Sequence, residues 1–221
     1  TSMQFIEKAG MFVGSESKMM QPKQLSHAAG QATSARRKQF PGHVTEQLNE
    51  LRSRLFAYYD EFPKNDAFLC AFEEALLFTP DEEQRVYTRI LMEDTNTRLV
   101  LLGLHESQPF PVHDHAGAAA CHIILYGCLR VRHYSEGEMI NKAMVRLECT
   151  SDRKLGAGDF SYVDREYAIH GLESLSQRTL LLNLQSRQLD SKERHWYFPA
   201  SMQQKNKQIW FRIRRKQDWK R

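Results

Sequence analysis

Two histidines separated by one residue stand in the segment PVHDHAGAAACHIILYG, residues 111–127, and their spacing could support metal chemistry. On an extended strand, residues i and i+2 project to the same face, so His113 and His115 would lie side by side while Asp114 points away. Two imidazoles on one wall can chelate a metal ion. The alternative is a pair of surface or hydrogen-bonded histidines, since the chain contains nine histidines.

A third imidazole is expected from a neighbouring strand, and His170 is the best candidate. It follows the segment GAGDFSYV, in which Gly156 and Gly158, like Gly127, fit tight turns between barrel strands. The PxHxH pattern, an apolar strand that ends in glycine and a later glycine-rich strand followed by histidine together favour a three-histidine metal site.

The elements that must position these histidines are short β segments. After about residue 97, turn residues separate segments rich in branched and aromatic side chains: RLVLLGLHES, CHIILYG, CLRVRHYS, AMVRLEC, GDFSYVD, RTLLLNLQS and IWFRIRR. Seven or more such segments predict an all-β barrel or sandwich rather than a parallel α/β sheet.

A helical region precedes the strands. Apolar residues recur at steps of three and four and predict an amphipathic helix: Val44, Leu48, Leu51, Leu55, Phe56 and Tyr59. DAFLCAFEEALLF predicts a second short helix, and the capping pattern Thr79-Pro80-Asp81-Glu82 a third. We therefore expect a loosely held polar and basic arm over residues 1–42 and one domain over 43–221, with a helical cap at 43–86 and a β-barrel at 87–221.

Composition narrows the class of protein. The chain has 221 residues, 41% of them hydrophobic, and no apolar run of the ~18 residues that span a bilayer. Its start, TSMQFIEKAG, lacks the apolar core of a signal peptide, and its four cysteines form no CxxC pair. We expect a cytoplasmic protein with reduced thiols and no membrane contact. The basic segment 205–221 carries no recognisable nucleic-acid-binding motif and is expected to be a solvated strand face.

From about Tyr87 to Phe198, the chain resembles the thiol dioxygenase branch of the cupin superfamily. The similar segments are YTR at 87–89, PVHDH at 111–115, LYGCLRV at 125–131 and the single His170. The first two are similar to cysteine dioxygenase, whereas HDHAG followed by LYG, and the late ERHWYF, look more like the cysteamine and plant cysteine oxidases. The resemblance implies a jelly-roll barrel, or double-stranded β-helix, in which His113, His115 and His170 hold Fe(II).

The resemblance also implies the reactants, a small thiol and dioxygen, and a substrate-binding residue. Arg89 of the YTR segment matches the arginine that binds the substrate carboxylate in cysteine dioxygenase, a role that suits the guanidinium fork. Tyr87, two residues earlier, would share its face on a strand and could donate its hydroxyl to the substrate. The alternatives are an exposed arginine at a strand start and a tyrosine that fills the core.

Several positions depart from the family pattern. Many cupins place a glutamate where this chain has Ala119 and Ala120, so a metal would meet three neutral imidazoles and should favour an incoming thiolate. The cysteine and tyrosine that are cross-linked in animal cysteine dioxygenases align with Ala120 and Gln185, while Cys121 is expected on the opposite face of its strand. Asn183 replaces an accompanying histidine.

Two hypotheses remain open from the sequence. The first is an iron-dependent thiol dioxygenase that oxidises free cysteine to cysteine sulfinic acid, or alternatively acts on cysteamine, 3-mercaptopropionate or a peptide's N-terminal cysteine. The second is a metal-binding cupin without catalysis. The intact histidine set beside Arg89 supports the first, and the lost cross-link residues support the second.

Overall fold

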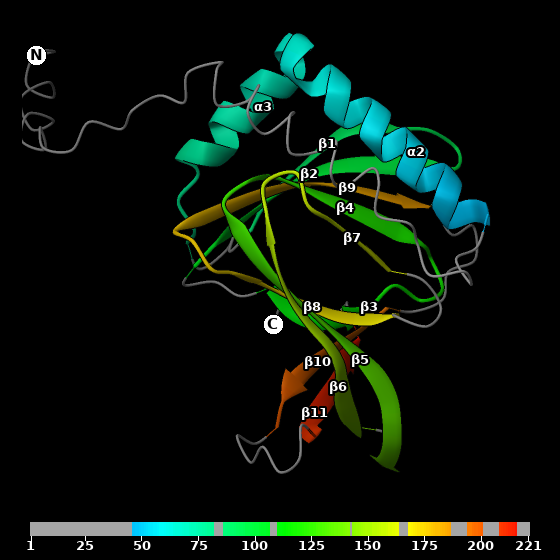
Figure 1. Cartoon of the computed structure of the whole chain (residues 1–221). Coiled ribbons are helices and arrows are strands. Elements are labelled where there is room, and N and C mark those ends of the chain that lie inside the picture. Colours follow the sequence, from blue (N-terminus) through cyan, green and yellow to red (C-terminus); the bar gives the residue numbers. More distant parts are fainter. Residues whose placement is uncertain are drawn as a thin grey trace, which may run out of the picture.

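The fold was determined as a computed structural model, which shows helices packed over a body of β-strands (Figure 1). It describes residues 46–81, 86–106, 110–141, 143–163, 168–186, 194–200 and 208–215. The predicted arm at 1–42 lies outside these ranges, as do Val44 and most of the basic segment 205–221.

Within the described residues, two α-helices and a short 3₁₀ helix precede the first strand: α2 (Glu46–Glu61), η1 (Phe62–Lys64) and α3 (Asp66–Leu77). Helix α2 buries the predicted apolar stripe, including Leu48, Leu51 and Leu55. Asn65 caps α3, since its side chain accepts a hydrogen bond from the backbone N–H of Phe68 at 3.2 Å. The first two predicted helices are confirmed. The third is not observed at Thr79–Asp81, and 82–85 lie outside the described residues.

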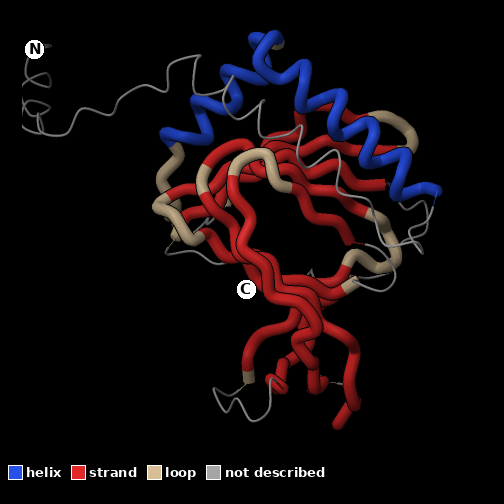
Figure 2. The backbone as a smooth tube through the Cα atoms, in the orientation of Figure 1, coloured by secondary structure: helices blue, strands red, loops and turns tan. Residues whose placement is uncertain are grey.

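Five strands form a twisted sheet beneath these helices (Figure 2). In spatial order they are β1 (Tyr87–Glu93), β2 (Thr97–His105), β9 (Arg178–Ser186), β4 (Ala120–Tyr126) and β7 (Phe160–Val163). All neighbouring pairs are antiparallel. We call this the five-stranded sheet.

The other six strands close into an antiparallel barrel. Its circular order is β3 (Phe110–Asp114), β8 (Ile169–Ser174), β5 (Cys128–Asn141), β6 (Met144–Gly156), β11 (Gln208–Arg215) and β10 (His195–Pro199). The predicted all-β barrel with a cap of short helices is therefore confirmed. The closed barrel uses only six of the strands, and the remaining five form the separate sheet above it (Figure 1).

Two apolar clusters lie on the two faces of the five-stranded sheet. Leu101, Cys121 and Leu182 pack against the helices on the outer face. On the inner face, Ile124 and Leu181 pack with barrel residues, among them Leu129. A third cluster lies within the barrel and includes Tyr134, Ile169 and Phe211. The described part of the chain contains no helix long and apolar enough to cross a membrane.

Gly127 makes the tight connection between β4 and β5 that carries the chain from the sheet to the barrel. Its φ is +81°, a conformation that L side chains rarely adopt, and a Cβ atom there would lie 2.2 Å from the carbonyl oxygen of Arg178. Gly158, before β7, also has a positive φ, 82°. The two turns predicted at these glycines are observed.

Candidate metal centre

Three barrel strands present histidines to the space beneath the five-stranded sheet. His133 on β5, His170 on β8 and His113 on β3 are cross-strand neighbours in one row, and Trp196 on β10 continues the row beyond His113. Because cross-strand partners share a face, all four side chains lie on the same side of the barrel wall. His115 follows directly after β3, and the structure brings it to the same place.

The imidazoles of His113, His115 and His170 converge through their Nε2 atoms. The Nε2 atom of His170 lies 3.0 Å from that of His115 and 3.1 Å from that of His113. All three side chains are buried, with exposed fractions of 6%, 3% and 0%. Their ligand atoms all lie within 4.8 Å of one another, so among the described residues these three histidines are placed to hold a metal ion.

These distances fit a metal bound on one triangular face. With metal–nitrogen bonds of about 2.1 Å, right angles between bonds place nitrogens about 3.0 Å apart, whereas tetrahedral angles place them about 3.4 Å apart. A single ring nitrogen holds either one proton or one lone pair, so His170 Nε2 cannot form an ordinary hydrogen bond along both contacts at once. A cation between the three nitrogens satisfies all of them.

Local contacts fix the direction of the His113 ring. Its Nδ1 atom lies 2.9 Å from the carbonyl oxygen of Pro111, which can only accept, so Nδ1 donates and Nε2 carries the lone pair that points into the cluster. The indole of Trp196 stacks on the imidazole with ring centroids 4.9 Å apart, and Phe110 meets its edge at 5.0 Å. A metal ligand needs this kind of outer support.

Asp114 faces away from the cluster, as the alternation of the strand predicted. Its carboxylate accepts hydrogen bonds from the backbone N–H of Ala116, from Nδ1 of His195 and from the hydroxyl of Tyr197, at 3.0, 3.0 and 3.1 Å. These bonds join the loop that carries His115 to strand β10. Asp114 is therefore a structural brace of the site and offers it no negative charge.

Burial disfavours the charged forms of His115, His122 and His170. Loss of water contact, followed by repulsion from His113, lowers the pKa of His115 and of His170 well below the usual histidine value. The same two causes, together with His133, lower the pKa of His122 to about 3. Neutral imidazoles have free lone pairs at physiological pH, which is the state that binds a metal.

A second row of polar side chains faces the histidines from the five-stranded sheet. His122 on β4 pairs in register with Ser161 on β7 and Asn183 on β9, and its ring centroid lies 5.3 Å from that of His170. His122 Nδ1, Ser161 Oγ and Asn183 Oδ1 are buried and have no hydrogen-bond partner among the described residues. This row supplies polar contacts beside the three-histidine cluster.

Sequence reasoning missed His122 and His133 as members of the site. His122 stands in the apolar segment ACHIILY, and His133 follows Leu129 and Val131 at the buried alternate positions of LRVRHY. A histidine at such a position is unusual, and their exposed fractions are 1% and 5%. That setting was the available signal, and only the register between strands shows that the two rings face His170.

The structure does not bring Arg89 and Tyr87 to the histidines. Arg89 pairs in register with Leu101, whose side chain packs under the helices, so Arg89 lies on the outer face of the five-stranded sheet. Its guanidinium forms an ion pair with Glu74 of α3, which also accepts a hydrogen bond from the Tyr87 hydroxyl, and the Arg89 side chain is 46% exposed. This placement corrects the expectation that Arg89 stands beside the metal site, and it agrees with the exposed-arginine alternative.

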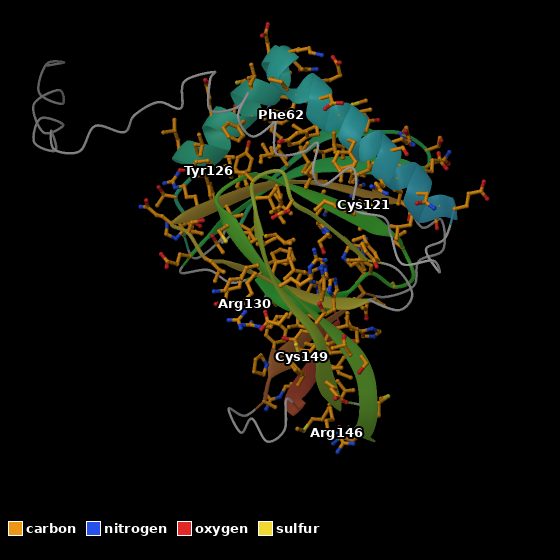
Figure 3. The ribbon with its side chains drawn as sticks, viewed as in Figure 1. Phe62, Cys121, Tyr126, Arg130, Arg146 and Cys149 are labelled. Atoms are coloured by element: carbon orange, nitrogen blue, oxygen red, sulfur yellow. The ribbon has the colours of Figure 1, made fainter. Side chains whose placement is uncertain are left out.

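The residues that replace the cross-link pair of the family lie on the faces that the alternation of β4 predicted. Cys121 packs against α2 and other cap residues on the outer face, and Figure 3 shows it between the sheet and the helix. Gln185 pairs with Ala120 on the inner face, whereas Ala119 belongs to the apolar cluster on the outer face. Both alanines are buried, so no carboxylate stands at either position.

No family model matches the chain. Solved structures with similar folds include KdgF from Halomonas sp., with 17% identity, 49% of this chain and 85% of that chain covered, and a TM-score of 0.38. A cupin superfamily protein from Desulfitobacterium hafniense has 15% identity over 52% and 87% of the two chains, with a TM-score of 0.36. The cupin domain of Schizosaccharomyces pombe Cnp3 has 10% identity over 49% and 65%, with a TM-score of 0.37. Similarity at this level does not assign a family, and the conclusions below rest on the histidines and their surroundings.

Proposed function

We propose that this protein is an iron(II)-dependent thiol dioxygenase that adds both atoms of dioxygen to the sulfur of a small thiol. The observation that carries the proposal is the convergence of three buried imidazoles with no carboxylate among them. The reaction is balanced without another reductant: the thiol and dioxygen become a sulfinic acid, sulfur loses four electrons, and the two oxygen atoms gain them. Because the chain resembles cysteine dioxygenase, L-cysteine is the first substrate to test.

Fe(II) bound by His113, His115 and His170 would supply a redox-active centre that keeps its full positive charge and attracts a thiolate. The chain's own contribution is positioning. Pro111 and Trp196 hold the His113 ring, and Asp114 anchors the adjoining loop to β10. Rigid ligands of this kind keep bound reactants close together, which removes much of the entropic barrier between them.

The polar row on the five-stranded sheet can contact a bound reactant. Asn183 and His122 lie on the face turned to the histidines, and the buried Asn183 Oδ1 can accept a hydrogen bond there while His122 Nδ1 can accept or donate one according to its tautomer, without competition from bulk water. With a pKa of about 3, His122 is neutral across the physiological range and acts as a dipole rather than as a cation.

The test combines metal analysis with oxygen uptake. The full chain, loaded anaerobically with Fe(II), should consume oxygen with at least one of cysteine, 3-mercaptopropionate, cysteamine or a peptide with an N-terminal cysteine. The product should contain two oxygen atoms from labelled dioxygen. Cys121→Ala, on the other face of the sheet, should retain the activity that His170→Ala loses. If iron is fully loaded and no thiol consumes oxygen, the non-catalytic metal-binding protein is the better account.

A further inference from the structure

His115 is held differently from the two other histidines of the cluster. His113 lies on β3 and His170 on β8, and each of these strands pairs with a neighbour on both sides. His115 lies in the connection from β3 to β4, where no strand of the described residues pairs with it. Its Nδ1 atom, like that of His170, is buried without a hydrogen-bond partner among the described residues. The position of the His115 ring therefore depends on the backbone of this connection.

The connection begins with a tight turn in an uncommon conformation. The backbone N–H of Ala118 donates to the carbonyl oxygen of His115 at 3.0 Å. The two residues between them have positive φ angles, 52° at Ala116 and 87° at Gly117, as in a type I′ turn. Glycine adopts such angles without steric cost, whereas a residue with a Cβ atom does not. Ala116 therefore needs support from neighbouring groups to keep this conformation.

Asp114 supplies this support and ties the turn to β10. Its Oδ1 atom accepts hydrogen bonds from the backbone N–H groups of Ala116 and His195, at 3.0 and 3.3 Å. Its Oδ2 atom accepts from Nδ1 of His195 and from the hydroxyl of Tyr197, at 3.0 and 3.1 Å. We call these four hydrogen bonds the Asp114 clamp. The clamp joins the backbone of the turn to two residues of β10.

A second anchor holds the far end of the connection to β9. The backbone N–H of Ala119 donates to Oγ of Ser186 at 3.0 Å, and the backbone N–H of Ser186 donates to the carbonyl oxygen of Ala119 at 2.8 Å. His115 is adjacent to Asp114 in the chain, whereas the whole turn separates it from Ala119. Of the two anchors, the Asp114 clamp is therefore the one that can set the direction of the His115 ring.

We propose that Asp114 is a positioning residue for His115, and that the Asp114 clamp determines whether the cluster offers a metal ion three nitrogens or two. When the clamp is lost, His113 and His170 stay in place on their paired strands, whereas His115 turns away as the turn at Ala116 relaxes. The inference rests on the metal site of the proposed function and not on its dioxygenase reaction. It gives β10 a role in metal binding although none of its side chains belongs to the three-histidine cluster.

Titration of the metal-free full chain with cobalt(II) tests the clamp, because the visible absorption of cobalt(II) depends on how many ligands bind it. Asp114→Ala should raise the Kd for cobalt(II) by about 10- to 100-fold and shift the spectrum toward that of His115→Ala. Adding Asp114→Ala to His115→Ala should change Kd by less than about twofold, because the clamp acts through His115. Tyr197→Phe removes one hydrogen bond of the clamp and should raise Kd less than Asp114→Ala does.

Asp152→Ala is the matched control. Asp152 accepts two hydrogen bonds from the guanidinium of Arg130, at 2.7 and 2.6 Å, in a partly exposed pair away from the cluster. Its replacement removes a hydrogen-bonded carboxylate from the barrel and should leave the Kd for cobalt(II) at the wild-type value. Urea unfolding of the metal-free variants measures separately the stability that each change costs.

An equal rise in Kd when Asp114→Ala is added to the wild type and to His115→Ala would overturn the inference, since Asp114 would then support the barrel as a whole. If Asp114→Ala does not fold, Tyr197→Phe is compared in the same two backgrounds, and an unchanged or equally raised Kd has the same meaning. A wild type that binds no cobalt(II) would overturn this inference and the proposed function together. If the clamp behaves as expected but no thiol consumes oxygen, only the dioxygenase proposal fails.

Discussion

The two faces of the five-stranded sheet differ in chemistry although the same strands form both. The outer face contributes Leu101, Cys121 and Leu182 to an apolar cluster with the helices. The inner face presents His122, the residue after Cys121, and Asn183, the residue after Leu182, to the histidines of the barrel. Adjacent residues of one strand therefore lie in different environments, one in the apolar cluster under the helices and the next beside the candidate metal site.

This comparison explains why Arg89 does not take the role that its sequence motif suggested. Arg89 is on an edge strand and on the outer face, where Glu74 neutralises it. Trp196 of β10, far from the histidine motif in the sequence, lies on the inward face against His113. Proximity to a motif in sequence is a weak guide to a site, because strand register decides which residues meet.

The largest expected effect is on metal content, and it separates the histidine site below the inner face from the outer face. His170→Ala removes the nitrogen that contacts both other ligands, so the purified variant should retain almost none of the roughly one metal ion per chain expected of the wild type. Cys121→Ala on the outer face should keep it. Elemental analysis after recombinant expression measures both, with nickel or zinc counted as substitutes for iron. Full metal retention by His170→Ala would remove that residue from the ligand set.

Acid should destabilise the metal-free protein through the buried histidines of the site. The pKa values of His115, His122 and His170 are lowered in the folded protein, so near pH 6.5 the unfolded chain binds protons at these residues that the folded chain does not bind. The stability associated with each is complete above pH 6.5 and falls by up to about 1.4 kcal/mol per pH unit below it.

Urea unfolding of the metal-free chain at pH 7.5 and pH 5.0 measures this dependence. His122→Asn should show a shallower dependence on pH than the wild type, since it removes one of the three groups. A free energy of unfolding that does not change between these pH values would contradict neutral burial of the histidines.

Leu182 and Asn183 are adjacent residues of β9, and replacing each by alanine compares the stability that the two faces of the sheet contribute. Leu182 is fully buried on the outer face, and Leu182→Ala should cost about 2–5 kcal/mol of unfolding free energy. Asn183→Ala removes a side-chain oxygen that has no partner among the described residues, so its cost should stay within about 1 kcal/mol. Chemical denaturation at neutral pH compares the two, and similar costs would refute the assignment of their faces.

The smallest effect is expected for Arg89→Gln. Its ion pair with Glu74 is exposed, and exposed pairs contribute little because solvent screens them. Metal content and the unfolding transition should remain close to those of the wild type. A large loss of metal in this variant would show that the two faces are coupled more closely than their contacts indicate.

Much of the fold could be predicted because it depends on local patterns. The apolar stripe of α2 and the strand segments from RLVLLGLHES to IWFRIRR follow periodicity, and Gly127 has the positive φ that its turn requires. The third helix was not observed at Thr79–Asp81, where a capping pattern has no apolar face to pack. Capping alone stabilises a helix too weakly to form it.

The candidate site was only partly predictable for a different reason. His113, His115 and His170 could be grouped from motif spacing, and the structure brings their Nε2 atoms together. His122 and His133 enter through cross-strand register, which depends on pairings between segments far apart in the chain. A single sequence carries no direct record of such pairings.

The bond between Asp114 and Tyr197 joins residues 83 positions apart. During synthesis, a ribosome releases β3 and its two histidines long before β10 exists to brace them and to place Trp196 against His113. The wall of the site is therefore finished only when the final strands emerge. Closure that depends on such distant partners also predicts slow folding, during which the histidines remain accessible to whichever metal arrives first.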